Sequence, residues 1–176
     1  TSSFQLYDSG VALGLNDTPF TVDDDSEGSS IGNGDLTANG GETLEISVNL
    51  KNFGSEDALG AIGILSSTNG SVTIDPSTSA VEFGDIAAGE SATNFTPFII
   101  TLEAGLPDGI DLELTLSLTD AEENHFGSGA LNLFSSGTEL SAVGMEMVGS
   151  FGGSVLEPGE TIDIRIELNN DGSTDA

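Results

Sequence analysis

Alternation of hydrophobic and polar residues is the main pattern along the chain. It is most regular in three runs, at residues 43–50, 109–118 and 161–168. Side chains two positions apart lie on the same face of a β-strand, so each run predicts a strand with one buried face and one solvent-facing side. The 3.6-residue period of an amphipathic helix is nearly missing. The pattern therefore predicts a structure built from strands.

Shorter apolar runs fill most of the remaining chain, and Gly, Asn, Asp or Ser residues stand in nearly every gap between them. Many short strands at a spacing of about ten residues, each with a half-buried face, are typical of an antiparallel β-sandwich. We therefore predict an all-β fold with an immunoglobulin-like Greek-key topology. The shorter predicted strands are residues 4–7, 59–65, 71–74, 80–83, 95–103, 129–134 and 142–148.

An internal repeat indicates how the chain is divided. The sequence "GGETLEISVNLKNFGSEDA" (40–58) aligns without gaps with "PGETIDIRIELNNDGSTDA" (158–176), at an offset of 158 − 40 = 118 residues. The alignment pairs Asn52 with Asn170 and preserves the apolar alternation. Because 118 residues is about the length of one sandwich domain and a linker, the repeat predicts one complete module and the first strands of a second.

Four parts follow from this division. Residues 21–135 form the complete sandwich, residues 136–141 form a short linker, and residues 142–176 begin a second, truncated module. The sequence at this junction is "SSGTEL" (135–140). Residues 1–20 carry an apolar face but precede the expected first strand. They either close a preceding repeat or add a strand to a neighbouring subunit, and the residues do not choose between these.

The charge balance narrows the range of partners. The 176 residues include 30 acidic residues but only Lys51 and Arg165 as cations, which gives a net charge of −28. Nucleic acid is excluded because binding phosphates needs clustered Lys and Arg, and an anionic membrane would repel the chain. Cysteine is absent, so disulfides and thiolate metal sites are excluded. No apolar run approaches the roughly 18 residues that membrane insertion as a helix requires.

A polar loop before the first regular strand is the candidate metal site. Within "DDDSEGSSIGNGDLTANGGE" (23–42), carboxylate and amide oxygens of the kind that Ca²⁺ prefers alternate with glycines that permit tight turns. The spacing does not match an EF-hand. The alternative is a solvated acidic loop with turns built on Asn and Asp side chains. The predicted Ca²⁺ ligands are Asp23, Asp24, Asp25, Asn33, Asp35 and Glu42.

The second copy of this loop differs in chemistry. Its sequence "VGSFGGSVLEPGE" (148–160) has only two acidic residues, Glu157 and Glu160. The strand that follows keeps its alternation. The carboxylates of the first copy are therefore not needed for the strand itself, and they either bind a metal ion or interact with solvent.

Residues for catalysis are scarce. His125 is the only histidine, so it cannot complete a usual zinc site in a chain without cysteine. No Ser lies in a nucleophile-elbow motif that could pair with it. Tyr7 is the only tyrosine and tryptophan is absent, which disfavours a sugar-binding platform for glycoside chemistry. We expect no catalytic residues and no enzyme activity.

Several motifs resemble those of a known module type. They are the "GNGD…GE" loop, the "NFGSEDA" turn, "FGDIAAGES", "PDG" before a strand, and "TDAEENHF". Together they resemble the immunoglobulin-like β-sandwich modules of large secreted bacterial proteins, such as those beside gingipain-type cysteine peptidases. The resemblance covers about residues 22–134, with a partial copy from about 142. It implies a role as spacer or binding surface, and no residue here matches the peptidase active site.

These observations predict a non-catalytic, calcium-stabilised structural or adhesive module of a large secreted or cell-surface bacterial protein. Expected partners are other copies of the repeat or neighbouring subunits, with surface glycans or proteins as further candidates. One alternative is a subunit of an extracellular filament, assembled by strand exchange between sandwiches. Another is an accessory domain of a secreted hydrolase.

Overall fold

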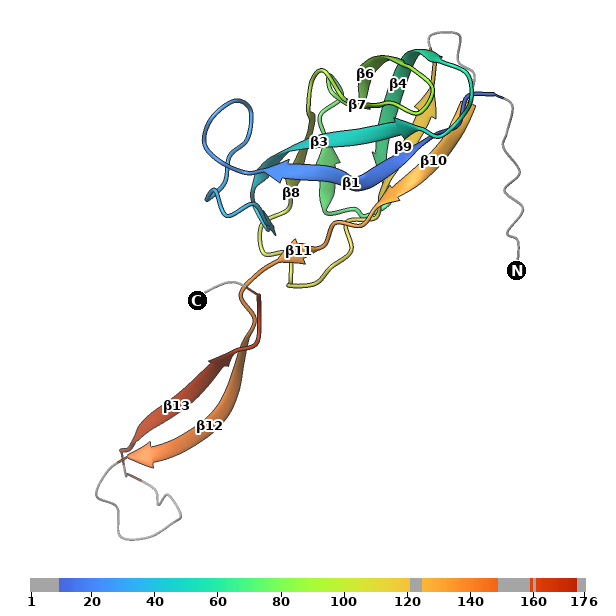
Figure 1. Ribbon diagram of the computed structural model, residues 1–176. Helices are drawn as coiled ribbons and strands as arrows, with labels where there is room; N and C mark the ends of the chain where they lie inside the picture. Colours follow the sequence, from blue (N-terminus) through green and yellow to red (C-terminus); the bar gives the residue numbers. More distant parts are fainter. Residues whose placement is uncertain (1–9, 121–124, 149–158, 160, 174–176) are drawn as a thin grey trace, which may run out of the picture.

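The structure is a computed structural model, and it describes residues 10–120, 125–148, 159 and 161–173 (Figure 1). These residues form strands, turns and loops, and none of them is helical. Accordingly, the described part of the chain offers no helix that could cross a membrane. The prediction of an all-β fold is confirmed.

The first sheet contains the most regular strand of the sequence at its centre. Strand β3 pairs with β1 on one side and with β8 and β7 on the other, all antiparallel, and β8 pairs in turn with β5. Alternate residues of β3 are fully buried, as the sequence pattern predicts. The strands are β1 Leu13–Asp23, β3 Thr43–Asn52, β5 Val72–Ile74, β7 Ser91–Thr93 and β8 Phe98–Leu102.

The second sheet has four antiparallel strands in the order β10-β9-β4-β6. The strands are β4 Ala58–Ser67, β6 Ala80–Ile86, β9 Leu114–Thr119 and β10 His125–Leu131. The predicted strand at residues 109–118 is shorter than expected, because Glu113 has a positive φ of 48° that interrupts the extended backbone. Only a single bridge, Asp111 to Phe134, precedes it.

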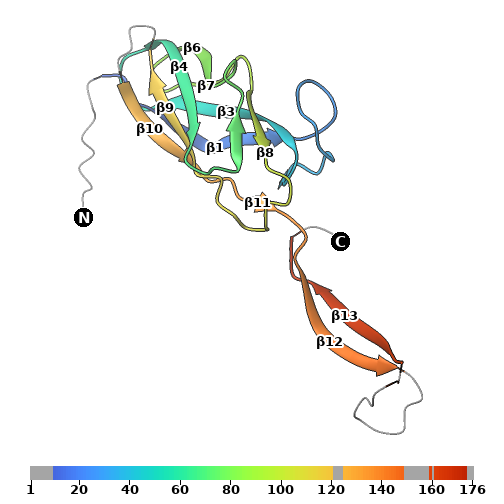
Figure 2. The same ribbon diagram turned by 180° about the vertical axis from the view of Figure 1, so that it is seen from behind.

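Both sheets contribute to one hydrophobic core, which gives the body of the molecule its two-layer arrangement (Figures 1 and 2). The first sheet supplies residues that are entirely inaccessible to solvent, including Ile46 and Ile100. The second supplies Phe83 and Leu116. Burial of this apolar surface is the main stabilising term of the fold. The arrangement fits a β-sandwich, and the immunoglobulin-like Greek-key topology remains a prediction.

The first strand of the module corrects one expected boundary. Residues 1–20 were expected to stand apart from the sandwich, but β1 runs from Leu13 to Asp23 across that boundary and pairs with β3 of the same chain. Its apolar alternation is broken by an irregularity between Leu15 and Phe20, which hides the strand from a period-two search. The predicted strand at residues 4–7 lies outside the described residues.

A narrow hairpin extends from the sandwich. Strands β12 (Leu140–Val148) and β13 (Asp163–Asn170) pair with each other alone and project away from the body in both views (Figures 1 and 2). A short parallel pair, β2 (Ala38–Asn39) with β11 (Ser135–Ser136), lies at the point where the chain leaves the sandwich. The predicted strands at 142–148 and 161–168 correspond to β12 and β13.

Candidate functional site

The candidate metal loop connects β1 to β3 (residues 24–42) and contains the short strand β2. It is organised around one buried carboxylate. The Asp24 side chain is inaccessible to solvent. Its Oδ2 accepts hydrogen bonds from the backbone N–H groups of Gly34 (3.1 Å) and Asp35 (3.2 Å), and its Oδ1 accepts one from Leu36 (2.8 Å). Three backbone N–H donors therefore satisfy the hydrogen-bonding capacity that this carboxylate would lose by burial.

Two residues of the loop show how tightly the chain wraps around Asp24. A Cβ atom on Gly32 would lie 2.2 Å from the Asp24 carbonyl oxygen, so only glycine fits there. Leu36 has φ of +64°, a conformation that costs a leucine free energy, and its side chain is 67% exposed. The hydrogen bond from Leu36 N–H to Asp24 holds this strained residue in place.

The other polar side chains of the loop form local turns. Asn33 Oδ1 accepts the Asp35 N–H at 2.9 Å, and Asp35 Oδ1 accepts both the N–H (2.8 Å) and the hydroxyl (2.6 Å) of Thr37. The hydrogen bond from the Thr37 hydroxyl is the main cause that lowers the pKa of the Asp35 carboxyl. Burial opposes this shift, and the hydrogen bonds from the Thr37 N–H and from Asn33 add to it. These are the turns expected of the solvated-loop alternative.

Asp23 and Asp25 make the same kind of turn at the start of the loop. Asp23 Oδ1 accepts the Asp25 N–H at 3.2 Å, and Asp25 Oδ1 accepts the Glu27 N–H at 2.6 Å and the Ser30 hydroxyl at 3.2 Å. These carboxylates therefore already have protein donors. Sequence reasoning missed Glu45, whose Oε1 accepts the Ser29 N–H at 2.6 Å and so closes the loop onto β3.

Glu42 lies near the base of the loop and is largely buried. Its Oε2 accepts the Asn39 N–H at 3.0 Å. Burial raises the pKa of the Glu42 carboxyl, and the negative charges of Asp24 and Asp35 raise it further. The hydrogen bond from Asn39 opposes this shift but does not cancel it.

The charges of Asp24 and Asp35 thus act on Glu42, while Asp23 and Asp25 belong to separate turns. Within residues 10–120, 125–148, 159 and 161–173, no three His, Cys, Asp or Glu side chains form a group that could hold a metal ion. The hydrogen bonds described above organise the loop. Calcium binding remains a prediction.

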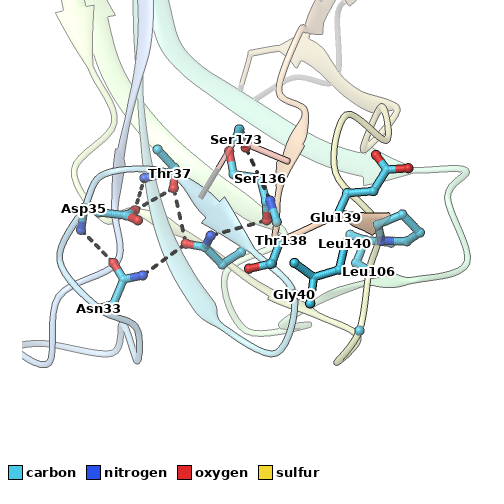
Figure 3. A pocket seen from close by; sticks show the side chains of 14 residues that line it. Asn33, Asp35, Thr37, Gly40, Leu106, Ser136, Thr138, Glu139, Leu140 and Ser173 are labelled. Atoms are coloured by element: carbon cyan, nitrogen blue, oxygen red, sulfur yellow. Dashed lines mark hydrogen bonds between the residues drawn. The ribbon is translucent and has the colours of Figure 1, made fainter. Parts of the chain in front are cut away.

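A polar pocket of about 930 Å³ lies where the sandwich meets the hairpin. In Figure 3, Asn33, Asp35 and Thr37 stand on one side of it, and Leu106, Glu139 and Leu140 on the other. The candidate loop therefore forms one wall of the junction between the sandwich and the hairpin, a position that the sequence did not reveal.

Asp108 joins the two parts directly. Its Oδ1 accepts the Gly137 N–H at 2.9 Å and the hydroxyl of Ser173, which follows β13. The hydrogen bond from Ser173, followed by the one from Gly137, lowers the pKa of the Asp108 carboxyl. Asn39 adds a hydrogen bond from its amide nitrogen to the Ser136 carbonyl at 3.3 Å. In the sequence, Asp108 stands out only as part of the "PDG" motif, which gives no signal of this contact.

Strands β1 and β3 are fastened together by an arrangement that we call the first clasp. Asn52, which is fully buried, accepts hydrogen bonds at Oδ1 from the N–H groups of Ala12 (3.3 Å) and Gly54 (3.0 Å). Phe53 N–H donates to the Ala12 carbonyl at 2.7 Å. A Cβ atom on Gly54 would lie 2.1 Å from the Gly10 carbonyl oxygen, so glycine is required.

The same arrangement recurs in the hairpin as the second clasp. Asn170 Oδ1 accepts the N–H groups of Glu139 (3.2 Å) and Gly172 (3.1 Å). Asp171 N–H donates to the Glu139 carbonyl at 2.6 Å, and a Cβ atom on Gly172 would lie 2.2 Å from the Gly137 carbonyl oxygen. Each contact of the first clasp therefore has a counterpart in the second.

Nothing in the described residues adds to the catalytic candidates of the sequence. His125 is exposed on β10, next to residues 121–124, which lie outside the described part. The lack of enzyme activity stays a prediction. A scan against protein-family models finds no match, and a search of curated proteins finds none either.

Proposed function

We propose that this chain is part of a tandem array of β-sandwich modules that serves as a structural or adhesive spacer of a secreted or cell-surface bacterial protein. The observation that carries the proposal is the second clasp, which repeats the hydrogen bonds and the close glycine contact of the first. A repeated unit with matching entry geometry is characteristic of modules joined end to end.

The clasps also set the boundaries of the repeat. Gly137 stands in the second clasp where Gly10 stands in the first, so one module spans residues 10–136. The sequence "LNLFSSG" (131–137) at its end resembles "FQLYDSG" (4–10). This likeness supports the alternative, stated above for residues 1–20, in which the leading part of the chain closes a preceding repeat.

The junction supports a spacer rather than a flexible tether. The β2–β11 pair and the two hydrogen bonds to Asp108 connect the sandwich to the hairpin within a few residues. The high negative charge favours solvation and mutual repulsion of the modules. Both features favour an extended, well-spaced array.

We include calcium in the proposal as a stabiliser of the candidate loop, on the strength of its oxygen-rich side chains. An ion that binds only the folded state stabilises it by mass action, so Ca²⁺ is expected to raise the melting temperature by several degrees. The gain is expected to disappear in Asp35→Ala and Glu42→Ala. An unchanged melting temperature after chelation would remove calcium from the proposal but leave the array intact.

The exposed hairpin is also compatible with the filament alternative, in which it would pair with a neighbouring subunit. Light scattering distinguishes the filament from the spacer. A spacer is expected to remain a monomer from low to high salt, with or without Ca²⁺. A filament of subunits with a charge near −28 would grow reversibly when cations screen their repulsion. Such ordered growth would contradict the spacer.

A further inference from the structure

The hairpin carries an apolar face that solvent reaches. Cross-strand pairing places Met147 opposite Ile164 and Met145 opposite Ile166, so these four side chains share one face. Their exposed fractions are 39%, 56%, 72% and 57%, respectively. Leu168 extends the same face with 58% exposure. Five large apolar residues in a row form a patch of the kind that marks an interaction surface.

The opposite face of the hairpin is polar. Arg165 and Glu146 lie opposite each other and form an ion pair at 3.4 Å, with both side chains exposed. Asp163 and Glu167 lie on that same side by strand alternation. The hairpin is therefore amphipathic, with one face suited to burial and the other to water.

The first module shows what covers such a face. The clasps align Ile164, Ile166 and Leu168 of β13 with Ile46, Val48 and Leu50 of β3, at the offset of 118 residues. The three β3 residues are completely buried. The partner strand matches as well, since Phe20 pairs with Val48 as Met145 pairs with Ile166.

The cover over β1 and β3 in the first module is the second sheet, β10-β9-β4-β6. Its inward residues are aliphatic or aromatic and nearly inaccessible, and glycines let the chains approach closely. Gly129 of β10, for example, lies against the Leu15 side chain, and a Cβ atom at this position would be only 3.1 Å from Leu15 Cδ1. The inward residues of this sheet include Leu65, Val81, Phe83, Leu114, Leu116, Leu118 and Leu131.

We propose that the apolar face of the β12–β13 hairpin docks onto a β-sheet with the sequence pattern of residues 58–131, to complete a second sandwich. The inference rests on the proposed array and names the partner of its hairpin. The matched residues on both strands, together with the repeated clasp, continue the inter-sheet interface of the first module into the second. A second copy of the chain is less suitable, because its own second sheet is already covered by β1 and β3.

The test extends the full chain by attaching a copy of residues 59–136 directly after Ala176, in register with the repeat. Docking is expected to slow amide hydrogen exchange in β12 and β13 by at least ~100-fold relative to the 176-residue chain, because the hairpin joins a cooperative unit. Oxidation of Met145 and Met147 by peroxide is expected to slow in parallel. Introducing Ile166→Asp into the extended chain is expected to reverse both effects.

A matched control shows whether the added sheet can fold. In it, residues 137–176 of the extended chain are replaced by residues 10–58. The added sheet can then pack against β1 and β3, the strands that it covers in the first module. If this control is protected and the natural hairpin is not, the inference is overturned, while the array stands on its clasps. Protection of the hairpin in the unextended chain that depends on protein concentration would also overturn it, in favour of a second copy as partner.

Discussion

The β1–β3 ribbon and the β12–β13 hairpin have the same fastening and opposite environments. Both are antiparallel pairs closed by an Asn and a Gly two residues later, with matching hydrogen bonds. Val48 in the ribbon is fully buried, whereas its counterpart Ile166 in the hairpin is 57% exposed. The comparison separates what the local sequence specifies from what the second sheet adds.

Local chemistry is sufficient to specify the ribbon. The clasp fixes the register of the strand pair, and the period of two puts all apolar residues on one face. Stability is a different matter, because an isolated two-stranded hairpin is marginal in water and needs a covering layer. The second sheet therefore supplies the burial that makes the ribbon of the first module a stable part of a domain.

The loops between the paired strands differ too. The first contains Asp24 at its buried centre, whereas the second, residues 149–162, is shorter and mostly outside the described residues. Because both strand pairs share the clasp, the acidic loop is an addition to the ribbon and not a condition for it. It lies beside the junction between the sandwich and the hairpin, where Asn33, Asp35 and Thr37 line the pocket.

The largest effect is expected from a charge introduced at position 48, compared with the same charge at its counterpart, position 166. Val48→Asp would bury an unpaired carboxylate and is expected to cost more than about 4 kcal/mol, enough to unfold the module. Ile166→Asp in the exposed hairpin is expected to change the unfolding free energy of the module by less than about 0.5 kcal/mol. Urea unfolding measures both. Equal effects would show that the hairpin is part of the first module's core.

Removing the two clasps is expected to have unequal effects. Asn52→Ala leaves the N–H groups of Ala12 and Gly54 and the carbonyls of Glu56 and Ile86 without their partner, at a cost of about 3 kcal/mol. Asn170→Ala is expected to leave the melting temperature of the module unchanged. Calorimetry provides the comparison, and a comparable loss in both variants would argue against independent units.

The loop centre is expected to matter somewhat less. Asp24→Ala removes the acceptor of three backbone N–H groups, but the surface loop can relax toward water, so we expect a loss of about 2 kcal/mol. Leu36→Gly is the matched control, because it keeps the N–H and removes the strain of a positive φ. It is expected to be neutral or slightly stabilising. A loss in Leu36→Gly as large as in Asp24→Ala would contradict this account of the loop.

The smallest effect is a pH dependence from Glu42. Its pKa is raised in the folded state by burial, so the folded protein holds the proton more tightly than the unfolded chain. Stability is therefore expected to fall as the pH rises above the ordinary Glu value of 4.5 through the raised pKa. Glu42→Gln, with chelator present, is expected to remove this part of the decline in urea titrations. Parallel pH profiles for the two proteins would contradict the assignment.

Alternation and turn residues were sufficient to predict the all-β class and most strands, because both depend on neighbouring residues. Strand β1 was missed since the irregularity between Leu15 and Phe20 breaks the period. The role of Asp24 as an internal acceptor, and of Asp108 as the contact to Ser173, depends on residues that are distant in sequence. One sequence without an alignment gives no signal for such pairs.

Six oxygen-bearing side chains were predicted to surround a cation. In the structure one of them, Asp24, is the buried acceptor at the centre of the loop, and Glu42 accepts the Asn39 N–H at its base. The other four form local turns. Composition alone could not distinguish these arrangements, because the same Asp and Asn residues serve as calcium ligands and as turn formers. The geometry of the loop, rather than its list of residues, separates Asp23 and Asp25 from Asp35 and Glu42.

The most direct test of the repeated module is an NMR comparison of the two clasps in the 176-residue chain. In Asn52→Ala the amide signals of Ala12 and Gly54 are expected to shift most, because they lose the Asn52 acceptor. In Asn170→Ala the amide signals of Glu139 and Gly172 are expected to shift in the same way. If the signals of Glu139 and Gly172 stay at random-coil positions in both the unmodified chain and Asn170→Ala, the second clasp and the array built on it are contradicted.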